Sequence, residues 1–132
     1  MSRLCFLDTF AALAMLSPSD SQHRRVLQWL AASRRPMVTT SFVLIEVADA
    51  LASRRTRGRF ATFMHGLERD PRTTIATATE GLFRRALALY NARSDRDWSL
   101  TDCASFVVMQ DMNITVTADH HFTQAGFVAL FE

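Results

Sequence analysis

Residues 95–126, DRDWSLTDCASFVVMQDMNITVTADHHFTQAG, decide the fold because they combine a helix start, an apolar helix and a short strand. Asp102 falls in the first turn of the predicted helix, and Asp119 follows the β-prone run 114–117. An α/β domain builds a ligand pocket by bringing side chains to the ends of neighbouring elements. The stretch therefore predicts half of a carboxylate site, and the other half must come from elsewhere in the chain.

Short apolar runs alternate with amphipathic stretches along the whole chain. Strands are predicted at residues 4–8, 37–40, 73–78 and 114–117, and helices at 9–16, 21–34, 41–54, 55–70, 79–91 and after Ser99. This order is typical of an α/β fold with a mostly parallel central sheet of about five strands and helices on both faces. No linker or repeat divides the sequence, so we expect one domain over residues 1–132.

Composition points to an ordinary globular core, with 48% hydrophobic residues. No apolar run reaches the roughly 18 residues of a membrane span, and no signal peptide is recognisable, so we expect a soluble cytoplasmic protein with no membrane partner. Cys5 and Cys103 stand in apolar surroundings without metal-ligand spacing, which predicts buried reduced thiols.

The net charge of +2 is too small to indicate a nucleic-acid binder by itself. All 15 basic residues are arginine, which suits phosphate binding but also follows from a coding bias. The absence of lysine excludes a lysine nucleophile, and the isolated glycines exclude a P-loop or a dinucleotide fingerprint.

Four acids are expected at one edge of the sheet. Asp8 follows the first predicted strand and Asp119 the fourth, while Glu46 and Asp102 lie in the first two turns of helices that begin after loops. Ligands of open parallel sheets bind at the carboxyl ends of the strands, where all four would converge.

Each acid also has a purely structural explanation. Aspartate is a leading N-cap residue, so Asp8 and Asp119 could simply cap the helices that follow them. Asp102 fits a capping box with Ser99, and Glu46 could share a solvated stripe with another acid of its helix. The sequence leaves both explanations open for each residue.

Clustered carboxylates repel one another unless a cation neutralises them. An oxygen-only set suits Mg²⁺ or Mn²⁺ and favours hydrolysis of a phosphodiester. As accessory residues we consider the hydroxyls of Thr9 and Thr117, which could orient a carboxylate or a water, and Asp95 in the loop before the helix.

Several motifs carry a resemblance to a known family. They are LDTFAALA at residues 7–14, TTSFVLIEVADAL from Thr39, DRDWSLTDCASFVVM from Asp95, and TADHHFTQAGF from Thr117. Together they resemble the PIN-domain nucleases and, among these, the VapC-type toxins of bacterial toxin–antitoxin pairs.

The resemblance implies a single PIN-like domain and a metal-dependent endoribonuclease that acts on single-stranded or loop RNA. It implies Asp8, Glu46, Asp102 and Asp119 as catalytic acids, with Asp8, Asp102 and Asp119 as ligands of Mg²⁺ or Mn²⁺. It also implies a homodimer silenced by a cognate antitoxin. The alternatives are a binding module without catalysis, or a nuclease for DNA or structured nucleic acid.

Overall fold

The computed structural model describes residues 3–117 and 128–129. Within them, one parallel sheet contains β1 (Cys5–Phe6), β2 (Met37–Thr40), β3 (Thr73–Ala76), β4 (Val116–Thr117) and β5 (Val128–Ala129). The strand order is β3-β2-β1-β4-β5, with Cys5 beside Met37 on one side and Val116 on the other. β1 is therefore the central strand, and the predicted α/β class and parallel sheet of about five strands are confirmed.

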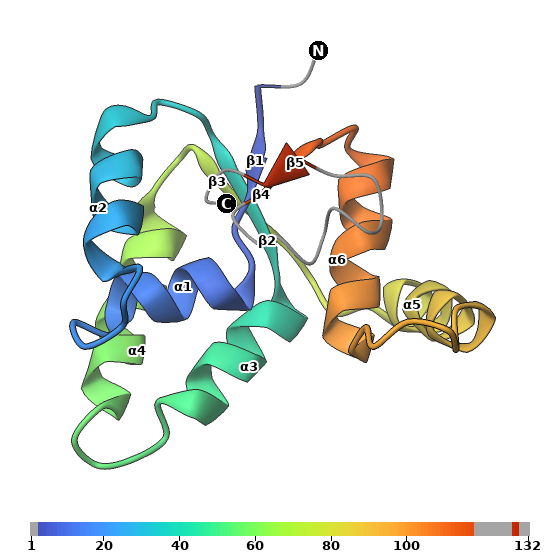
Figure 1. Ribbon diagram of the computed structural model, residues 1–132, viewed down its shortest axis with the longest axis horizontal. Helices are drawn as coiled ribbons and strands as arrows, with labels where there is room; N and C mark the ends of the chain where they lie inside the picture. Colours follow the sequence, from blue (N-terminus) through green and yellow to red (C-terminus); the bar gives the residue numbers. More distant parts are fainter. Residues whose placement is uncertain (1–2, 118–127, 130–132) are drawn as a thin grey trace.

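Helices cover both faces of this sheet (Figure 1). The described part of the chain contains α1 (Thr9–Leu16), α2 (His23–Ala32), α3 (Ser41–Ala50), α4 (Arg57–Arg69), α5 (Glu80–Ala92) and α6 (Leu100–Asp111). Helices α1, α2 and α4 lie on one face, and α6 with α5 lies on the other. Helix α3 leaves the lower end of the sheet between these two groups.

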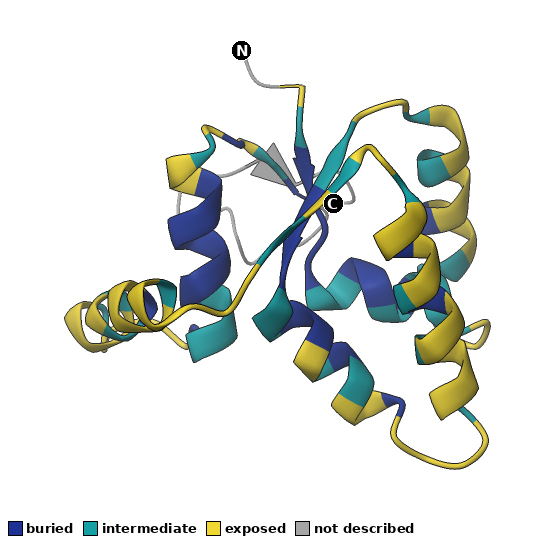
Figure 2. Cartoon of the chain, turned by 180° about the vertical axis from the view of Figure 1, so that it is seen from behind, coloured by how far each residue is buried: buried dark blue, intermediate teal, exposed yellow. Residues whose placement is uncertain are grey.

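Helix α6 is the most buried helix (Figure 2), because every residue from Cys103 to Met109 is buried. A helix that is apolar around its whole circumference has to be enclosed by other elements. Here the enclosing elements are the sheet, α3 and α5. Phe106 and Met109 of α6 join Phe6 of the central strand in one core.

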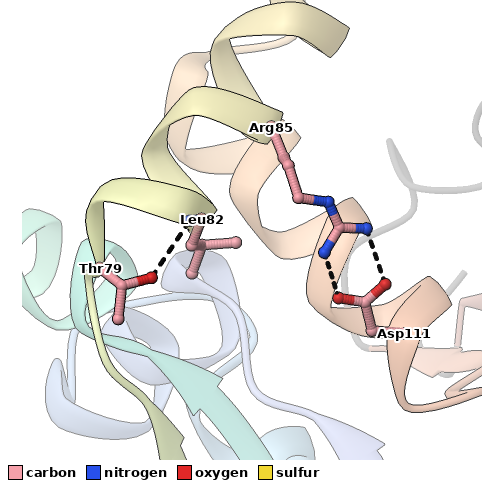
Figure 3. A network of polar contacts seen from close by, with 4 residues as sticks. All are labelled: Thr79, Leu82, Arg85 and Asp111. Carbon is pink, nitrogen blue, oxygen red and sulfur yellow. Dashed lines mark hydrogen bonds and ion pairs between the residues drawn. The ribbon is translucent and has the colours of Figure 1, made fainter.

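Helices α5 and α6 are joined by an exposed ion pair between Arg85 and Asp111. Figure 3 shows this pair as two parallel contacts. Nη1 and Nη2 of Arg85 lie 2.5 and 2.8 Å from the two carboxylate oxygens. These hydrogen bonds hold the pKa of Asp111 below its usual value. Helix α5 begins with the Thr79 side chain accepting from the Leu82 amide at 3.1 Å.

Two of the helix boundaries that differ from the sequence prediction have clear local reasons. Helix α2 begins at His23 rather than at residue 21, because Asp20 closes the preceding turn by accepting from the Gln22 amide at 2.8 Å instead of capping the helix. Helix α3 ends at Ala50 rather than at residue 54. The Thr56 hydroxyl donates to the Leu51 carbonyl at 2.9 Å and so completes a turn there.

The end of α6 is built by Asn113, the one non-glycine residue with a positive φ, 57°, in the described part of the chain. The Asn113 amide donates to the Gln110 carbonyl at 3.2 Å, and the Ile114 amide donates to the Met109 carbonyl at 2.7 Å. This pair of bonds is a Schellman motif, in which asparagine replaces the usual glycine. It turns the chain from α6 into β4 and buries Ile114.

We expect Asn113→Gly to keep or slightly raise the free energy of unfolding, because glycine adopts positive φ without steric cost. Asn113→Val should lower it by about 1–3 kcal/mol, since a β-branched residue is strained at this conformation. Urea unfolding followed by circular dichroism measures both effects. Equal stability of the two variants would contradict this account of the helix end.

No helix in residues 3–117 or 128–129 has the length and apolar character needed to cross a membrane. Cys5 and Cys103 are both buried and free, as predicted.

Candidate active site

The topology brings three of the four predicted acids to the carboxyl edge of the sheet. Asp8 follows β1, and Glu46 lies in the second turn of α3, which begins directly after β2. Helix α6 leads into β4, which runs parallel to β1, so α6 starts at this same edge with Asp102 in its first turn. Asp119 lies outside the described residues.

Asp8 is a buried acid, with only 2% of its surface exposed. Its Oδ1 accepts from the Ala11 amide at 2.8 Å, which makes it the N-cap of α1. Its Oδ2 accepts from the Thr117 hydroxyl of β4 at 3.3 Å. Both carboxylate oxygens are therefore held by described neighbours, and the suggestion that Thr117 orients a carboxylate agrees with this contact.

Thr39 of β2 is a supporting residue that sequence reasoning missed. Its buried hydroxyl donates to the Leu7 carbonyl at 2.7 Å, just before Asp8. The Leu7 amide in turn donates to the Val38 carbonyl at 2.8 Å. The only sequence signal was a pair of threonines at the end of a predicted strand, and the second of them, Thr40, caps α3.

Asp102 forms the capping box predicted at the start of α6. Its Oδ2 accepts from the Ser99 amide at 3.0 Å, and the Ser99 side chain accepts from the Asp102 amide at 3.0 Å. The side chain of Asp102 is half-buried, so the box fixes the acid without enclosing it. Capping thus sets the position of this carboxylate.

Glu46 lies on α3 between the buried residues Val43 and Val47 and is itself half-buried. Asp49, the other acid of this helix, is fully on the exposed side. The two acids therefore differ in environment, and Glu46 is the one closer to the core.

The remaining accessory residues have different surroundings. Thr9 is the half-buried first residue of α1. Asp95 is exposed and paired with Arg93, whose Nε and Nη2 lie 2.9 and 3.1 Å from its oxygens. This hydrogen bonding lowers the pKa of Asp95. The described contacts of Asp95 are thus those of a loop ion pair.

Two buried thiols lie near the acids, and burial is the main cause of their shifted pKa values. Burial raises the pKa of Cys5 to about 12, with Arg35 opposing the rise and Asp8 adding to it. Burial likewise raises the pKa of Cys103 to about 11, with a contribution from Asp102. Both thiols stay neutral near pH 7 and are unsuited to act as nucleophiles.

Residues 5–128 of the chain match the family model described as "PIN domain". The chain belongs to the PIN-domain family. It is 28% identical over 127 residues to the 23S rRNA-specific endonuclease VapC20 of Mycobacterium tuberculosis, covering 95% of this chain and 96% of that protein. The predicted membership in the PIN-domain nucleases is confirmed, together with the similarity to a VapC toxin.

Solved structures agree with this assignment. The crystal structure of VapC20 from Mycobacterium tuberculosis, a toxin that cleaves the sarcin–ricin loop, superimposes with a TM-score of 0.84 at 27% identity over 97% of this chain and 99% of that chain. FitAcB from Neisseria gonorrhoeae has a TM-score of 0.63 at 16% identity over 97% of this chain and 96% of that chain, and shares the fold.

The donor chemistry of this PIN domain fits a hard divalent cation, because the acids at the carboxyl edge offer oxygen atoms only. Among the described residues, no three histidine, cysteine, aspartate or glutamate side chains are grouped so as to hold a metal ion. The predicted ligand set includes Asp119, which lies outside those residues.

The double role of Asp8 can be separated by substitution. We expect Asp8→Ala to lower the free energy of unfolding by about 1 kcal/mol, because the cap of α1 is lost. Asp8→Asn should be as stable as the parent or more stable, since asparagine caps equally well and carries no buried charge. Urea unfolding in EDTA compares the variants, and an equal loss in both would contradict the capping role.

Proposed function

We propose that this PIN domain is a metal-dependent endoribonuclease that hydrolyses phosphodiester bonds of single-stranded or loop RNA. The observation that carries the proposal is the burial of Asp8 as a helix cap. Asparagine and serine cap as well as aspartate, and burying a charge is unfavourable. Capping alone therefore does not explain the carboxylate, whereas a cation site at the carboxyl edge does.

In this proposal, Asp8, Asp102 and Asp119 hold Mg²⁺ or Mn²⁺, and Glu46 completes the acidic set. When bound, such an ion lowers the pKa of water and offsets charge on the phosphate oxygens. Thr117 keeps the Asp8 carboxylate oriented through its hydroxyl. The water oxygen attacks phosphorus and the bond to O3′ breaks, which leaves a 5′-phosphate and a 3′-hydroxyl.

The biological setting is part of the same proposal. The relative of 28% identity is named as an endonuclease of 23S rRNA, and its crystal structure is described as that of a toxin. We place this chain in the same class, as a cytoplasmic toxin that forms a homodimer and is neutralised by a cognate antitoxin.

Asp8→Asn and Asp102→Asn should each abolish cleavage of a single-stranded RNA, because each removes a proposed ligand charge while asparagine can still accept the capping hydrogen bonds. Asp49→Asn, an exposed acid of α3, is the matched control and should cleave like the parent. Cleavage is followed on labelled oligonucleotides with Mg²⁺, with Mn²⁺ and in EDTA, and parent activity should disappear in EDTA.

The same assay includes DNA of identical sequence, which the parent should leave intact. Undiminished RNA cleavage by both variants, or by the parent in EDTA, would refute the proposed chemistry. Efficient cleavage of the DNA would refute the substrate class.

A cluster of arginines supports a polyanionic substrate. Arg54, Arg55, Arg57 and Arg59 are exposed in and after the α3–α4 connection, and no acid occurs between Asp49 and Glu68. None of the four has an ion-pair partner in the part of the chain that the structure describes. The helix dipole also disfavours cations in the first turn of α4, so this placement needs another reason. A coding bias explains arginine in place of lysine but not this clustering.

Salt dependence tests the cluster. Each arginine that contacts a phosphate should contribute about 0.7 to the slope of log affinity against log salt for single-stranded RNA. The pair Arg54→Gln and Arg55→Gln should therefore weaken RNA binding in EDTA and reduce this slope by about 1.4. Arg24→Gln on α2 is the control and should leave the slope unchanged. A slope that stays the same in the double variant would contradict this role.

A further inference from the structure

A second site adjoins the acidic edge, where α5 ends and α6 begins. A pocket of about 810 Å³ opens between the last turn of α5, the connecting loop and the first residues of α6. Its size falls in the usual range for small-ligand sites. Figure 1 shows the α5–α6 connection and the α3–α4 connection on opposite sides of the lower end of the sheet.

The pocket is coupled directly to Asp102. Ser99 lines its wall and exchanges two hydrogen bonds with Asp102, one helical turn away. A group bound in the pocket would therefore lie beside the acid that we propose as a metal ligand. The pocket therefore lies next to the proposed catalytic centre.

Trp98 forms a closely packed part of the pocket wall. The indole is 8% exposed and packs edge-on against Phe106, with ring centroids 4.8 Å apart. The guanidinium groups of Arg93 and Arg96 lie 5.1 and 5.9 Å from the centre of the Trp98 ring. The indole N–H is buried and has no hydrogen-bond acceptor among the described residues. Because this N–H is closed off from solvent, Trp98 serves as a packed wall of the pocket and not as a donor to a ligand.

The charge of the pocket does not favour an anion. Arg93 and Arg96 are both paired with Asp95, at 2.9 and 3.8 Å, and Asp97 adds a further negative charge to the lining. Two arginines and two aspartates leave the cluster formally neutral. A phosphate group or an acidic peptide would gain little here, whereas an uncharged ligand would not be opposed.

The remaining lining combines one aromatic ring, two leucines and the polar residues Asn91 and Ser94. Tyr90 is 46% exposed in the last turns of α5, and Asn91 beside it is exposed with both amide donors and an acceptor available. Leu87 and Leu100 supply apolar surface. Aromatic rings provide stacking faces for unpaired bases, and amide groups read their edges.

We propose that this pocket binds an unstacked, uncharged nucleobase of the RNA, one that neighbours the cleaved bond. Tyr90 provides the stacking face, and Asn91 contacts the edge of the base. This inference rests on the proposed ribonuclease activity and adds a specificity site to it. It gives a physical reason for a preference for single-stranded or loop RNA, because a base in a duplex cannot enter the pocket.

The test uses Tyr90→Ala, Tyr90→Phe and Asn91→Ala in the full chain. Phe83→Ala is the matched control, because Phe83 is an exposed aromatic residue of the same helix, at 38%, that does not line the pocket. Steady-state cleavage is measured on RNA oligonucleotides that differ only at the nucleotides flanking the cut. Stacking is measured in EDTA with 2-aminopurine at each of these positions.

Tyr90→Ala should raise KM about fivefold or more, as expected for the loss of one stacked base, with a smaller change in kcat. It should also abolish the 2-aminopurine quenching at one position, while Tyr90→Phe and Phe83→Ala behave like the parent. Asn91→Ala should reduce the preference for one base at that position.

Unchanged KM, quenching and base preference in Tyr90→Ala and Asn91→Ala would overturn the pocket assignment while leaving the ribonuclease proposal intact. Weakened inhibition by an antitoxin with unchanged RNA cleavage would also overturn it, in favour of a protein contact. A parent protein that cleaves no RNA with Mg²⁺ or Mn²⁺ would instead refute the proposed function itself.

Discussion

The structure depends on the hydrogen bonds made by one buried carboxylate, that of Asp8. Asp8 is almost inaccessible, and a buried charge is tolerated only when hydrogen bonds compensate for its lost hydration. One oxygen accepts from the start of α1, and the other accepts from Thr117 at the end of β4. Thr39 fixes the preceding carbonyl from β2. The central strand, both of its neighbours and the first helix are thus aligned around the residue that we propose as a metal ligand.

Much of the fold could be predicted because its signals are local. Apolar runs located the strands, and the caps formed by Asp8, Thr40 and Ser99 involve partners only three residues away. Two of the boundary errors arose where a loop residue competes with the helix. Asp20 closes a turn instead of capping α2, and Thr56 ends α3 four residues early. Propensity and periodicity do not show which of two available hydrogen bonds a loop will choose.

In the candidate site too, some features could be predicted from the sequence and others could not. Asp8, Glu46 and Asp102 could be placed at one edge, because in a parallel sheet the direction of the strands is fixed by the order of the elements. The contacts of Thr117 and Thr39 join residues 109 and 32 positions apart, so no sequence window contains them. Asp95, suggested as an accessory acid, forms ion pairs with Arg93 and Arg96, its neighbours along the loop. The pocket beside Trp98 was not predictable, because it exists only where α5, the loop and α6 meet.

Helix α6 links the separate parts of the site through rigid connections. At its first turn, the capping box fixes Asp102 and places Ser99 in the wall of the pocket. At its last turn, the Schellman motif directs the chain into β4, whose Thr117 bonds to Asp8. Because the middle of α6, from Cys103 to Met109, is buried in the core, its two ends are joined by a closely packed segment. The position of Asp102 relative to Asp8 is therefore set by the length and packing of one buried helix, which is the preorganisation that a carboxylate cation site requires. In that arrangement, the roles of cap and ligand support each other, because the hydrogen bonds that start each helix also aim its acid.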